Sequence, residues 1–376
     1  MSGIYIHIPY CKQKCSYCNF YFSTDTRSKT EMVNSICKEI ELRKNEINDS
    51  IETIYFGGGT PSLLDRDEFK LIFEKLYSVF KISENPEITI EANPDDLTAE
   101  KIEILKSSPV NRLSIGIQSF FDEDLKFMNR AHDSKQSVNS VKSAQDAGFE
   151  NITIDLIYGS QTTTDEMWKK NLETALGLNV PHISSYALTI EPRTLLHHQI
   201  KTKKIPNTDE TKQERQFMML TDTLTENGFL HYEISNFGKP GFLSKHNSSY
   251  WKGIPYLGLG PSAHSYDGKN RSWNTANNTI YLNHINNGKL PKEIEELTAE
   301  NRFNEMVMIR LRMMEGLSID EVLENFPQHF LDELIQEIKP HLENGTVVFE
   351  NGKIRITKKG LFLSDGISSS LFRLKD

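Results

Sequence analysis

The chain has 376 residues, of which 37% are hydrophobic and 25% are charged, a composition typical of a folded globular protein. At about 150 residues per domain, this length predicts two or three domains. The 52 acidic residues outnumber the 43 basic ones, giving a net charge of −9. This balance argues against nucleic acid as the main partner, because binding phosphates requires a basic surface.

The sequence contains no stretch of the ~18 uncharged apolar residues that a membrane span needs. The first residues also lack the basic segment of a secretory signal. We therefore expect a cytoplasmic protein without a membrane span, and peripheral association with a membrane stays open.

Apolar runs and helical segments alternate over the first two thirds of the chain, which is typical of an α/β fold with parallel strands. Most of these runs are nearly continuous in apolar residues, which predicts strands covered on both faces. The expected strands are 4–8, 53–56, 87–91, 112–118, 151–157, 182–188 and a weaker one at 232–235. The expected helices are 29–45, 66–80, 99–106, 135–147, 165–178 and 208–227.

The ends of the expected helices carry recognisable signals. Thr98 and Ser134 are predicted N-caps, and Gly148 and Gly228 stand where helices should stop. Six or seven consecutive βα units predict a partly open TIM-type (β/α)6 barrel over residues 1–237.

The periodicity fades after the barrel. We expect residues 238–297 to be an irregular connecting region and residues 298–376 to be a small, helical, winged-helix-like C-terminal domain. In that domain we expect helices at 299–314, 319–325 and 330–342 and a hairpin with strands at 347–349 and 353–356. Asn351-Gly352 suits the type I′ turn of the hairpin. DNA binding is disfavoured because the last helix carries acidic side chains, namely Asp332, Glu333 and Glu337.

Three of the four cysteines fall within eight residues, at Cys11, Cys15 and Cys18. A disulfide framework would spread cysteines along a small secreted chain, so this cluster indicates metal chemistry. Three thiolates on one loop can hold three corners of a [4Fe-4S] cluster and leave one iron open for a small molecule. Cys37 lies inside an expected helix and is interpreted as incidental. Zinc with His7 as fourth ligand is the alternative, and free thiols are disfavoured because they would be oxidisable.

Polar residues recur where the expected strands end. Gly57-Gly58-Gly59-Thr60-Pro61 follows the second strand, Glu91 and Gln118 end the third and fourth, and Asp155 lies in the fifth. Functional residues of such barrels gather at the carboxyl ends of strands, and a polar group among apolar residues is costly unless it is paired. These positions therefore predict one shared polar ligand. A tight turn is the alternative reading of the glycines, although it would need fewer of them.

The spacing Cys-x3-Cys-x2-Cys after a first barrel strand resembles the signature of the radical S-adenosylmethionine (SAM) superfamily. The resemblance implies that the open iron of a [4Fe-4S] cluster binds the amino and carboxylate groups of SAM. It also implies an electron donor, since reduction of the cluster cleaves SAM to a 5′-deoxyadenosyl radical. In that arrangement the cofactor supplies the difficult chemistry and the protein orients it.

Several phrases resemble one branch of that superfamily, which contains oxygen-independent coproporphyrinogen III dehydrogenase and the HemW family of haem chaperones. These phrases lie at 5–11, 57–61, 112–119, 128–132 and 155–159. The resemblance implies that SAM is surrounded by Tyr5, Tyr17, Gly58, Gly59, Thr60, Glu91, Gln118, Arg130, Asp155 and Ala187. It places Arg130 against a carboxylate. From the residues alone, Arg130 could equally be a surface arginine, and Tyr5 and Tyr17 could be core aromatics.

Two departures separate the chain from the dehydrogenase. That enzyme carries a fourth cysteine two residues after the third, whereas here Cys18 is followed by Asn19 and Phe20. It also has an extension before the first strand, which here begins at Ile4. Both features resemble the HemW family.

The segment His246-Asn247-x-x-Tyr250-Trp251 resembles the haem-binding motif of the HemW family. The resemblance implies that His246 ligates haem iron and that Tyr250 and Trp251 stack on the porphyrin. A histidine packed in the core is the alternative. The segment 258–265 also matches the branch and is expected either to bring His264 to the same cavity or to form a structural glycine turn.

Three functions stay open. The preferred one is a haem chaperone that carries a [4Fe-4S] cluster and SAM and passes haem to an acceptor protein. The alternative is a radical SAM oxidoreductase that decarboxylates coproporphyrinogen III to protoporphyrinogen IX, so the sequence leaves open whether the protein is an enzyme. A radical SAM protein acting on nucleic acid is disfavoured by the charge.

Overall fold

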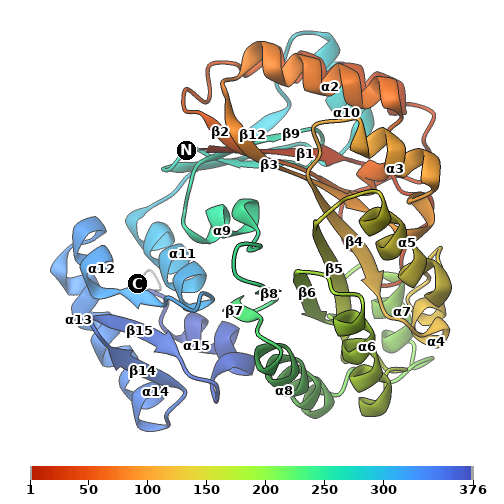
Figure 1. The fold of residues 1–376 in the computed structure, drawn as a ribbon. Helices are drawn as coiled ribbons and strands as arrows, with labels where there is room; N and C mark the ends of the chain where they lie inside the picture. The colour runs from red at the N-terminus through yellow and green to blue at the C-terminus, as the bar shows by residue number, and fades with distance from the viewer. Residues whose placement is uncertain (1, 374–376) are drawn as a thin grey trace.

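The computed structural model describes residues 2–373. A curved sheet of twelve strands forms its centre, in the order β12-β11-β10-β9-β1-β2-β3-β4-β5-β6-β8-β7 (Figure 1). The barrel strands are β1 (Ser2–Ile8), β2 (Ile51–Gly58), β3 (Ile82–Ala92), β4 (Arg112–Gln118), β5 (Asn151–Tyr158) and β6 (His182–Ala187). These six pair in parallel in chain order. The predicted α/β fold with a partly open barrel is confirmed.

Helices cover the outer side of this sheet (Figure 1). The long ones are α1 (Lys29–Leu42), α2 (Arg66–Val79), α3 (Ala99–Lys106), α5 (Ser134–Asp146), α6 (Asp165–Gly177) and α8 (Glu210–Glu226). Short 3-10 turns follow β2 and β3, at Pro61–Leu63 and Pro94–Asp96. None of the helices among residues 2–373 is long and apolar enough to cross a membrane.

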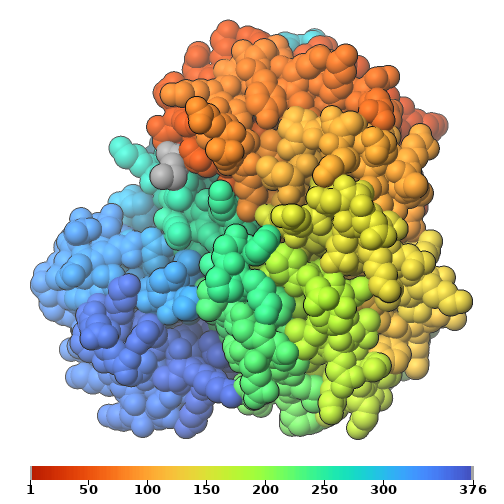
Figure 2. Space-filling model, viewed as in Figure 1, coloured from red at the N-terminus to blue at the C-terminus, as the bar shows by residue number. Residues whose placement is uncertain are grey.

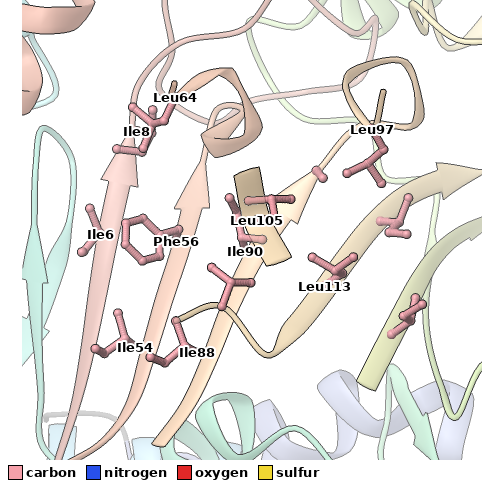
Figure 3. Close-up of a cluster of buried hydrophobic side chains, with 14 of the residues drawn as sticks. Ile6, Ile8, Ile54, Phe56, Leu64, Ile88, Ile90, Leu97, Leu105 and Leu113 are labelled. Atoms are coloured by element: carbon pink, nitrogen blue, oxygen red, sulfur yellow. The ribbon is translucent and has the colours of Figure 1, made fainter. Parts of the chain in front are cut away.

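The two faces of the barrel sheet differ in chemistry, which corrects the expectation that most strands are nearly continuous in apolar residues. In β1, Ile4, Ile6 and Ile8 are at most 1% exposed and belong to the main core. Figure 3 shows such side chains, among them Ile6 and Phe56, on the helix-covered side of the sheet. The alternate residues of each strand are mainly polar or aromatic. Because side chains alternate across a strand, these residues line the inner side of the barrel.

Most predicted helix ends are confirmed. The side chain of Thr98 caps α3 by accepting a hydrogen bond from the backbone of Lys101. Gly148 and Gly228 adopt φ values of +92° and +76°, the left-handed region that suits a residue ending a helix. The N-cap prediction for Ser134 was one residue off. Asp133 caps α5 because Gln136 stands three residues later and completes a reciprocal pair of bonds, a capping box.

Residues 238–297 are not irregular. They form α9 (Lys245–Trp251), β9 (Tyr256–Leu259), β10 (His264–Tyr266), β11 (Asn270–Asn274), α10 (Asn278–Asn286) and β12 (Lys292–Glu296). Strand β9 pairs with β1 in parallel, and β10 to β12 continue the sheet antiparallel. At the other end, the weak seventh strand is a hairpin of β7 (Leu230–Glu233) and β8 (Asn236–Gly238), which pairs antiparallel to β6. Strands of three to five residues are too short to show a clear period in the sequence.

The glycine-rich segment 258–265 is a structural turn. A Cβ on Gly258 would lie 1.9 Å from the carbonyl oxygen of His264, so only glycine fits. Helix α1 supports the turn through a buried ion pair: Arg43 donates to the Gly258 carbonyl (2.6 Å), and Glu39 accepts from the backbone N–H of Gly260 (2.8 Å). His264 itself is exposed on β10 beside Trp273.

The C-terminal region has a core of its own around Phe303, Phe326 and Phe330. It consists of α11 (Ala299–Leu311), β13 (Leu317–Ser318), α12 (Ile319–Asn325), α13 (Gln328–Glu337), α14 (Lys339–Glu343), β14 (Val347–Glu350), β15 (Lys353–Ile356), a 3-10 turn (Leu361–Leu363) and α15 (Ser364–Ser370). Asn351 and Gly352 both have positive φ, as the predicted type I′ turn requires. The expected helix 330–342 is split into two. Figure 2 shows this region packed against the rest of the molecule.

Candidate cluster and cofactor site

The cysteine loop begins where β1 ends and is tied down at two points. The backbone N–H of Cys11 donates to Ser23 (3.0 Å). At buried Ser16, the backbone N–H donates to Met128 (3.0 Å) and the carbonyl accepts from Leu196 (2.8 Å). Two short helices that the sequence did not predict supply these contacts: α4 (Asp122–Phe127) ends just before Met128, and α7 (Leu195–Lys201) includes Leu196.

The three predicted cluster ligands lie close enough to interact electrostatically. Burial raises the pKa of the Cys11 thiol to about 12, and the neighbouring charges of Cys18 and Cys15 add to the shift. Burial also raises the pKa of Cys18. All three side chains keep some exposure. Thiols that converge in this way become ligands when a cation binds, because the metal charge reverses the pKa shift.

Two side chains donate hydrogen bonds to the cysteine sulfurs. The Thr60 hydroxyl lies 3.3 Å from Cys11 Sγ, and Arg130 Nη1 lies 3.3 Å from Cys15 Sγ. Asn93 joins the two donors, since its Nδ2 donates to Thr60 Oγ1 (3.2 Å) and its Oδ1 accepts from Arg130 Nη2 (2.6 Å). Hydrogen bonds to sulfur stabilise thiolates and tune iron–sulfur clusters. The residues present therefore fit a [4Fe-4S] cluster.

The zinc alternative gains no support. His7 is 6% exposed, its Nε2 is bonded to the Tyr21 carbonyl oxygen (2.9 Å), and its Nδ1 lies 3.3 Å from the Tyr5 hydroxyl. Within residues 2–373, no group of three His, Cys, Asp or Glu side chains is placed to hold a single metal ion. A cubane cluster instead spreads its thiolates over separate irons. Cys37 is buried in α1 and packs in the main core.

The glycine run after β2 fits tightly against β1. A Cβ on Gly58, whose φ is +105°, would lie 2.6 Å from the ring of His7, and one on Gly59 would lie 2.6 Å from the backbone oxygen of Tyr10. Packing within the chain therefore demands these two glycines. The backbone N–H of Gly58 donates to Glu91 (3.2 Å), which fixes the carboxylate at this end of the sheet.

Two acidic side chains face the barrel interior without a basic partner within salt-bridge distance among the described residues. Burial raises the pKa of Glu91 to about 7, and the charge of Asp155 contributes. Burial likewise raises the pKa of Asp155 to about 6. Tyr55 donates to Glu91 (2.9 Å), and Ser114 donates to Asp155 (3.4 Å). Buried carboxylates that repel one another favour a cationic ligand, and SAM carries a sulfonium charge.

The other predicted SAM residues lie at the same end of the strands. Gln118 ends β4 with a φ of +67°, a strained backbone at a break in the pairing with β5. Gln118 and Arg130 both cross Gly116, where a Cβ would lie 2.9 Å and 3.2 Å from their side-chain nitrogens. Ala187 ends β6. Tyr17 lies near Arg130, whose charge opposes the rise in the Tyr17 pKa that burial causes.

The predicted haem residues lie on α9, which enters the inner side of the sheet (Figure 1). His246 is 2% exposed and stacks on Tyr55 with the ring centroids 5.0 Å apart. Its Nδ1 is bonded to Thr53 Oγ1 (2.7 Å) and its Nε2 to the Tyr250 hydroxyl (2.8 Å). Glu87 accepts from the backbone N–H of His246 (2.9 Å). In this conformation His246 is a core histidine with both ring nitrogens engaged.

The C-terminal region holds the end of α9. The guanidinium of Arg310 donates to the carbonyl oxygen of Trp251 and pairs with Glu321 at 2.9–3.0 Å. The guanidinium of Arg312 lies 5.1 Å from the centre of the Trp251 ring. Trp251 and Tyr250 are half-buried. The predicted haem segment therefore lies between the barrel interior and the C-terminal region, whereas His264 lies on β10.

Comparison with known proteins assigns the family. Residues 5–175 match the radical SAM superfamily, and residues 297–363 match the HemN C-terminal domain. The chain is 33% identical over 379 residues to the heme chaperone HemW of Bacillus subtilis, with 98% of each chain covered. It is 34% identical to the heme chaperone HemW of Lactococcus lactis, covering 97% of this chain and 96% of the relative. The chain belongs to the HemW family.

A solved structure supports the same fold. Coproporphyrinogen III oxidase (HemN) from Escherichia coli superposes with a TM-score of 0.85 at 22% identity, covering 99% of this chain and 89% of that one. At this identity the likeness concerns the fold. Membership of the radical SAM superfamily implies a [4Fe-4S] cluster and SAM, as the sequence predicted.

Several polar residues around the sites were missed in the sequence. Asn93 links the two donors to the cysteines, Thr53 and Glu87 hold His246, and Arg112 is buried on the same face of the sheet. All but Asn93 alternate with apolar residues in strands that were interpreted as nearly continuous apolar runs. A strict count of alternation along each strand would have found them. Asn93, in contrast, lies just after β3, and only its place near Glu91 in the sequence could have indicated a role at the site.

Proposed function

We propose that this member of the HemW family binds haem as cargo and passes it to an acceptor protein, with a [4Fe-4S] cluster and SAM bound in its barrel. The observation that carries the proposal is the match to two proteins named heme chaperones at 33–34% identity over nearly the whole chain. The acceptor protein and the electron donor to the cluster are further partners under this proposal.

In this proposal Cys11, Cys15 and Cys18 hold the cluster. When bound, the cluster supplies an open iron for SAM and the electron that SAM cleavage requires. Thr60 and Arg130 donate to two of the cysteine sulfurs. The positive charge of Arg130 also offsets the negative charge of the thiolates.

The SAM pocket in this proposal lies next to the cluster, at the carboxyl ends of β1 to β6. Glu91 and Asp155 supply negative charge toward the cationic ligand, and the Gly58 N–H and the Tyr55 hydroxyl hold Glu91 in place. The remaining residues proposed to surround SAM are Tyr5, Tyr17, Gly59, Thr60, Gln118, Arg130 and Ala187. Gly58 donates to Glu91, and Asn93 joins Thr60 to Arg130, which supports a single pocket.

Haem is proposed to bind at α9, with His246 as the iron ligand. Burial lowers the pKa of His246 to about 3, helped by the charge of Arg112, so the imidazole is neutral at physiological pH. The neutral form is the one that ligates metals. The Tyr250 hydroxyl occupies Nε2 at 2.8 Å, so iron ligation requires Tyr250 to move away. The proposal therefore includes an opening of α9, after which Tyr250 and Trp251 stack on the porphyrin.

The test is carried out on anaerobically reconstituted full-length protein. Haem is titrated into the protein and the Soret band is followed, and coproporphyrinogen III is then supplied with SAM and a reductant. We expect one haem per chain, weaker binding by His246→Ala, and no protoporphyrinogen IX. Absence of stoichiometric haem binding would contradict the chaperone proposal. Turnover of coproporphyrinogen III would replace it with the oxidoreductase alternative.

A further inference from the structure

A buried arginine with two unpaired guanidinium nitrogens, counted over the described residues, lies on the inner face of the barrel sheet. Arg112 is the first residue of β4 and is 1% exposed. Its Nε and Nη2 are buried and have no hydrogen-bond partner within residues 2–373. Over the same residues, no carboxylate lies within 4.0 Å of its guanidinium. A buried charge is costly unless it is paired and hydrogen-bonded, so this guanidinium is a candidate to bind an anion.

The neighbouring polar groups are engaged elsewhere. His182 is bonded through Nδ1 to Thr153 (2.6 Å) and through Nε2 to the Tyr232 hydroxyl (2.8 Å). Asp155 accepts from Ser114. Glu87, on the adjacent strand β3, accepts from the backbone N–H groups of Lys245 and His246 at 3.0 and 2.9 Å. Neither Glu87 nor Asp155 lies within 4.0 Å of the Arg112 guanidinium, although the charge of Arg112 opposes the rise in the Asp155 pKa that burial causes.

The position of Arg112 along the strand separates it from the cysteine end. Gln118, which ends β4 in the proposed SAM pocket, is six positions after Arg112, and at about 3.3 Å per residue the two lie about 20 Å apart along the strand. The methionyl carboxylate of SAM belongs beside the cluster, beyond the reach of an arginine side chain at the other end of the strand.

The pairing register of the strands instead places Arg112 in a row of residues that reaches α9. Arg112 pairs with Thr89, Thr89 with Tyr55, and Tyr55 with Tyr5, so the four residues form one row across β4, β3, β2 and β1. Tyr55 in turn stacks on His246, with ring centroids 5.0 Å apart. Burial lowers the pKa of His246, and the positive charge of Arg112 adds to this shift. The arginine therefore faces the segment proposed to bind haem.

We infer that Arg112 binds a ligand carboxylate, namely a propionate of the haem cargo, when α9 opens. A planar guanidinium offers two parallel N–H donors that match the two oxygens of a carboxylate. The inference rests on the proposed function, since it names a group that recognises the proposed cargo. It also gives the inner face two contacts with haem, His246 to the iron and Arg112 to a propionate.

The experiment compares haem with haem dimethyl ester, which retains the iron and the ring but lacks the free carboxylates. Both probes are titrated into wild-type holoprotein, Arg112→Met, and the control Arg66→Met, which removes an exposed arginine on α2. We expect the wild type to bind haem at least about tenfold more tightly than the ester, because a charge-assisted hydrogen bond is lost with the ester. In Arg112→Met the affinity for haem should fall to that for the ester. Arg66→Met should bind both probes as the wild type does.

Each of the other possible binding results contradicts either the proposed function or the proposed role of Arg112. Binding of neither probe by the wild type contradicts the proposed function itself. If the ratio of haem affinity to ester affinity in Arg112→Met equals that of the wild type, whether or not both affinities fall, the proposed role of Arg112 is overturned. Loss of the SAM-induced change in the electron paramagnetic resonance (EPR) spectrum of the reduced cluster, with haem affinity intact, would assign Arg112 to the SAM carboxylate instead.

Thermal unfolding distinguishes ligand recognition from a structural role. Since Arg112 has no ion pair to lose, we expect unliganded Arg112→Met to unfold at the same temperature as the wild type or higher. A clear decrease would show that Arg112 stabilises the fold through a partner within the chain and would overturn the inference. If Arg112→Met does not fold, Arg112→Lys is used instead, because it keeps the positive charge but lacks the two parallel N–H donors. Its ratio of haem affinity to ester affinity then tests the role of Arg112 in the same way.

Discussion

The inner face of the barrel sheet has two ends that differ in how far their polar groups are already satisfied. At the carboxyl ends of the strands, the cysteine thiols are partly exposed and receive hydrogen bonds from Thr60 and Arg130. At the opposite end, His246 is 2% exposed and both of its ring nitrogens are bonded within the chain. The cysteine end is therefore arranged to receive a ligand, whereas at the His246 end the polar groups are bonded to one another. We call the latter the closed end.

This difference is the one expected between the site of a resident cofactor and the site of a transient cargo, the roles proposed above for the two ends. A cluster that stays bound benefits from ligands and sulfur donors held in place beforehand, because little ordering remains to be done on binding. A cargo that must leave benefits from a site that regains internal hydrogen bonds when the cargo departs, because the groups released are not left unsatisfied. The predictions below test whether the two ends behave in these two ways.

The largest effect is expected at the cysteine loop. Cys11→Ser, Cys15→Ser and Cys18→Ser should each abolish the visible absorbance and the EPR signal of the reconstituted cluster, since each removes one of only three protein ligands. Cys37→Ser is the matched control and should retain both signals, because Cys37 is buried in α1. A cluster that persisted in all three loop variants would refute the assignment of the ligands.

At the closed end, His246→Ala should weaken haem binding by about tenfold or more while leaving the cluster signals unchanged. The free energy of unfolding should also fall by about 1–3 kcal/mol, since Thr53 and Tyr250 lose a buried hydrogen-bond partner. Tyr250→Phe should act in the opposite sense on haem, because it frees Nε2 and keeps an aromatic ring. Weaker haem binding by Tyr250→Phe would argue against the opening of α9.

SAM binding should depend on pH through Glu91. Its pKa of about 7 means that the carboxylate loses its negative charge as the pH falls from 8 to 6, so the affinity for cationic SAM should fall by up to about tenfold per pH unit. Glu91→Gln should flatten this dependence, which calorimetric titration across the range would show. A pH profile identical in the two proteins would exclude Glu91 from the SAM pocket.

The same shift affects the stability of the unliganded protein. Between the ordinary pKa of 4.5 and the folded-state value of about 7, the folded protein holds a proton on Glu91 that the unfolded chain releases. The contribution of Glu91 to the free energy of unfolding therefore decreases as the pH rises through this window. Glu91→Gln should remove this part of the pH dependence in denaturant titrations.

The smallest effect is expected at Asn93, the residue that links Thr60 and Arg130. Asn93→Leu removes both hydrogen bonds at similar volume, so the two sulfur donors should lose alignment and the cluster potential should fall. We expect a few-fold weaker SAM affinity and a lower midpoint in an anaerobic redox titration. Asn286→Leu, which changes an exposed residue of α10, is the control. An unchanged midpoint in Asn93→Leu would limit Asn93 to packing.

The cluster end could be predicted from the sequence because its signals are local. Three cysteines on one loop, a glycine run after a strand and a carboxylate at a strand end are visible without knowledge of distant contacts. The closed end could not be predicted in this way. The environment of His246 depends on Thr53 and Glu87, more than 150 residues earlier in the chain. Such contacts arise only when α9 enters the barrel.

The fold shows the same limit. Long βα units were recognised because each buries a regular apolar stripe against the sheet. The strands β9 to β12 were missed because they are three to five residues long and depend on pairing with β1 and on the ion pair of Glu39 and Arg43. The glycines at 258 and 260 were visible, but their neighbours in space were not.

The hydrogen bond from Arg310 to the Trp251 carbonyl couples the opening of α9 to the release of the C-terminal region. If haem binding requires α9 to open, the contact between α9 and α11 must break at the same time, so part of the binding energy is spent on freeing the C-terminal region. Linkage is reciprocal: a protein that binds the freed C-terminal region raises haem affinity by the same factor by which haem raises the affinity for that protein, and a protein that holds the region against α9 lowers haem affinity. An acceptor that restores the Arg310 contact would thereby promote haem release without touching the iron.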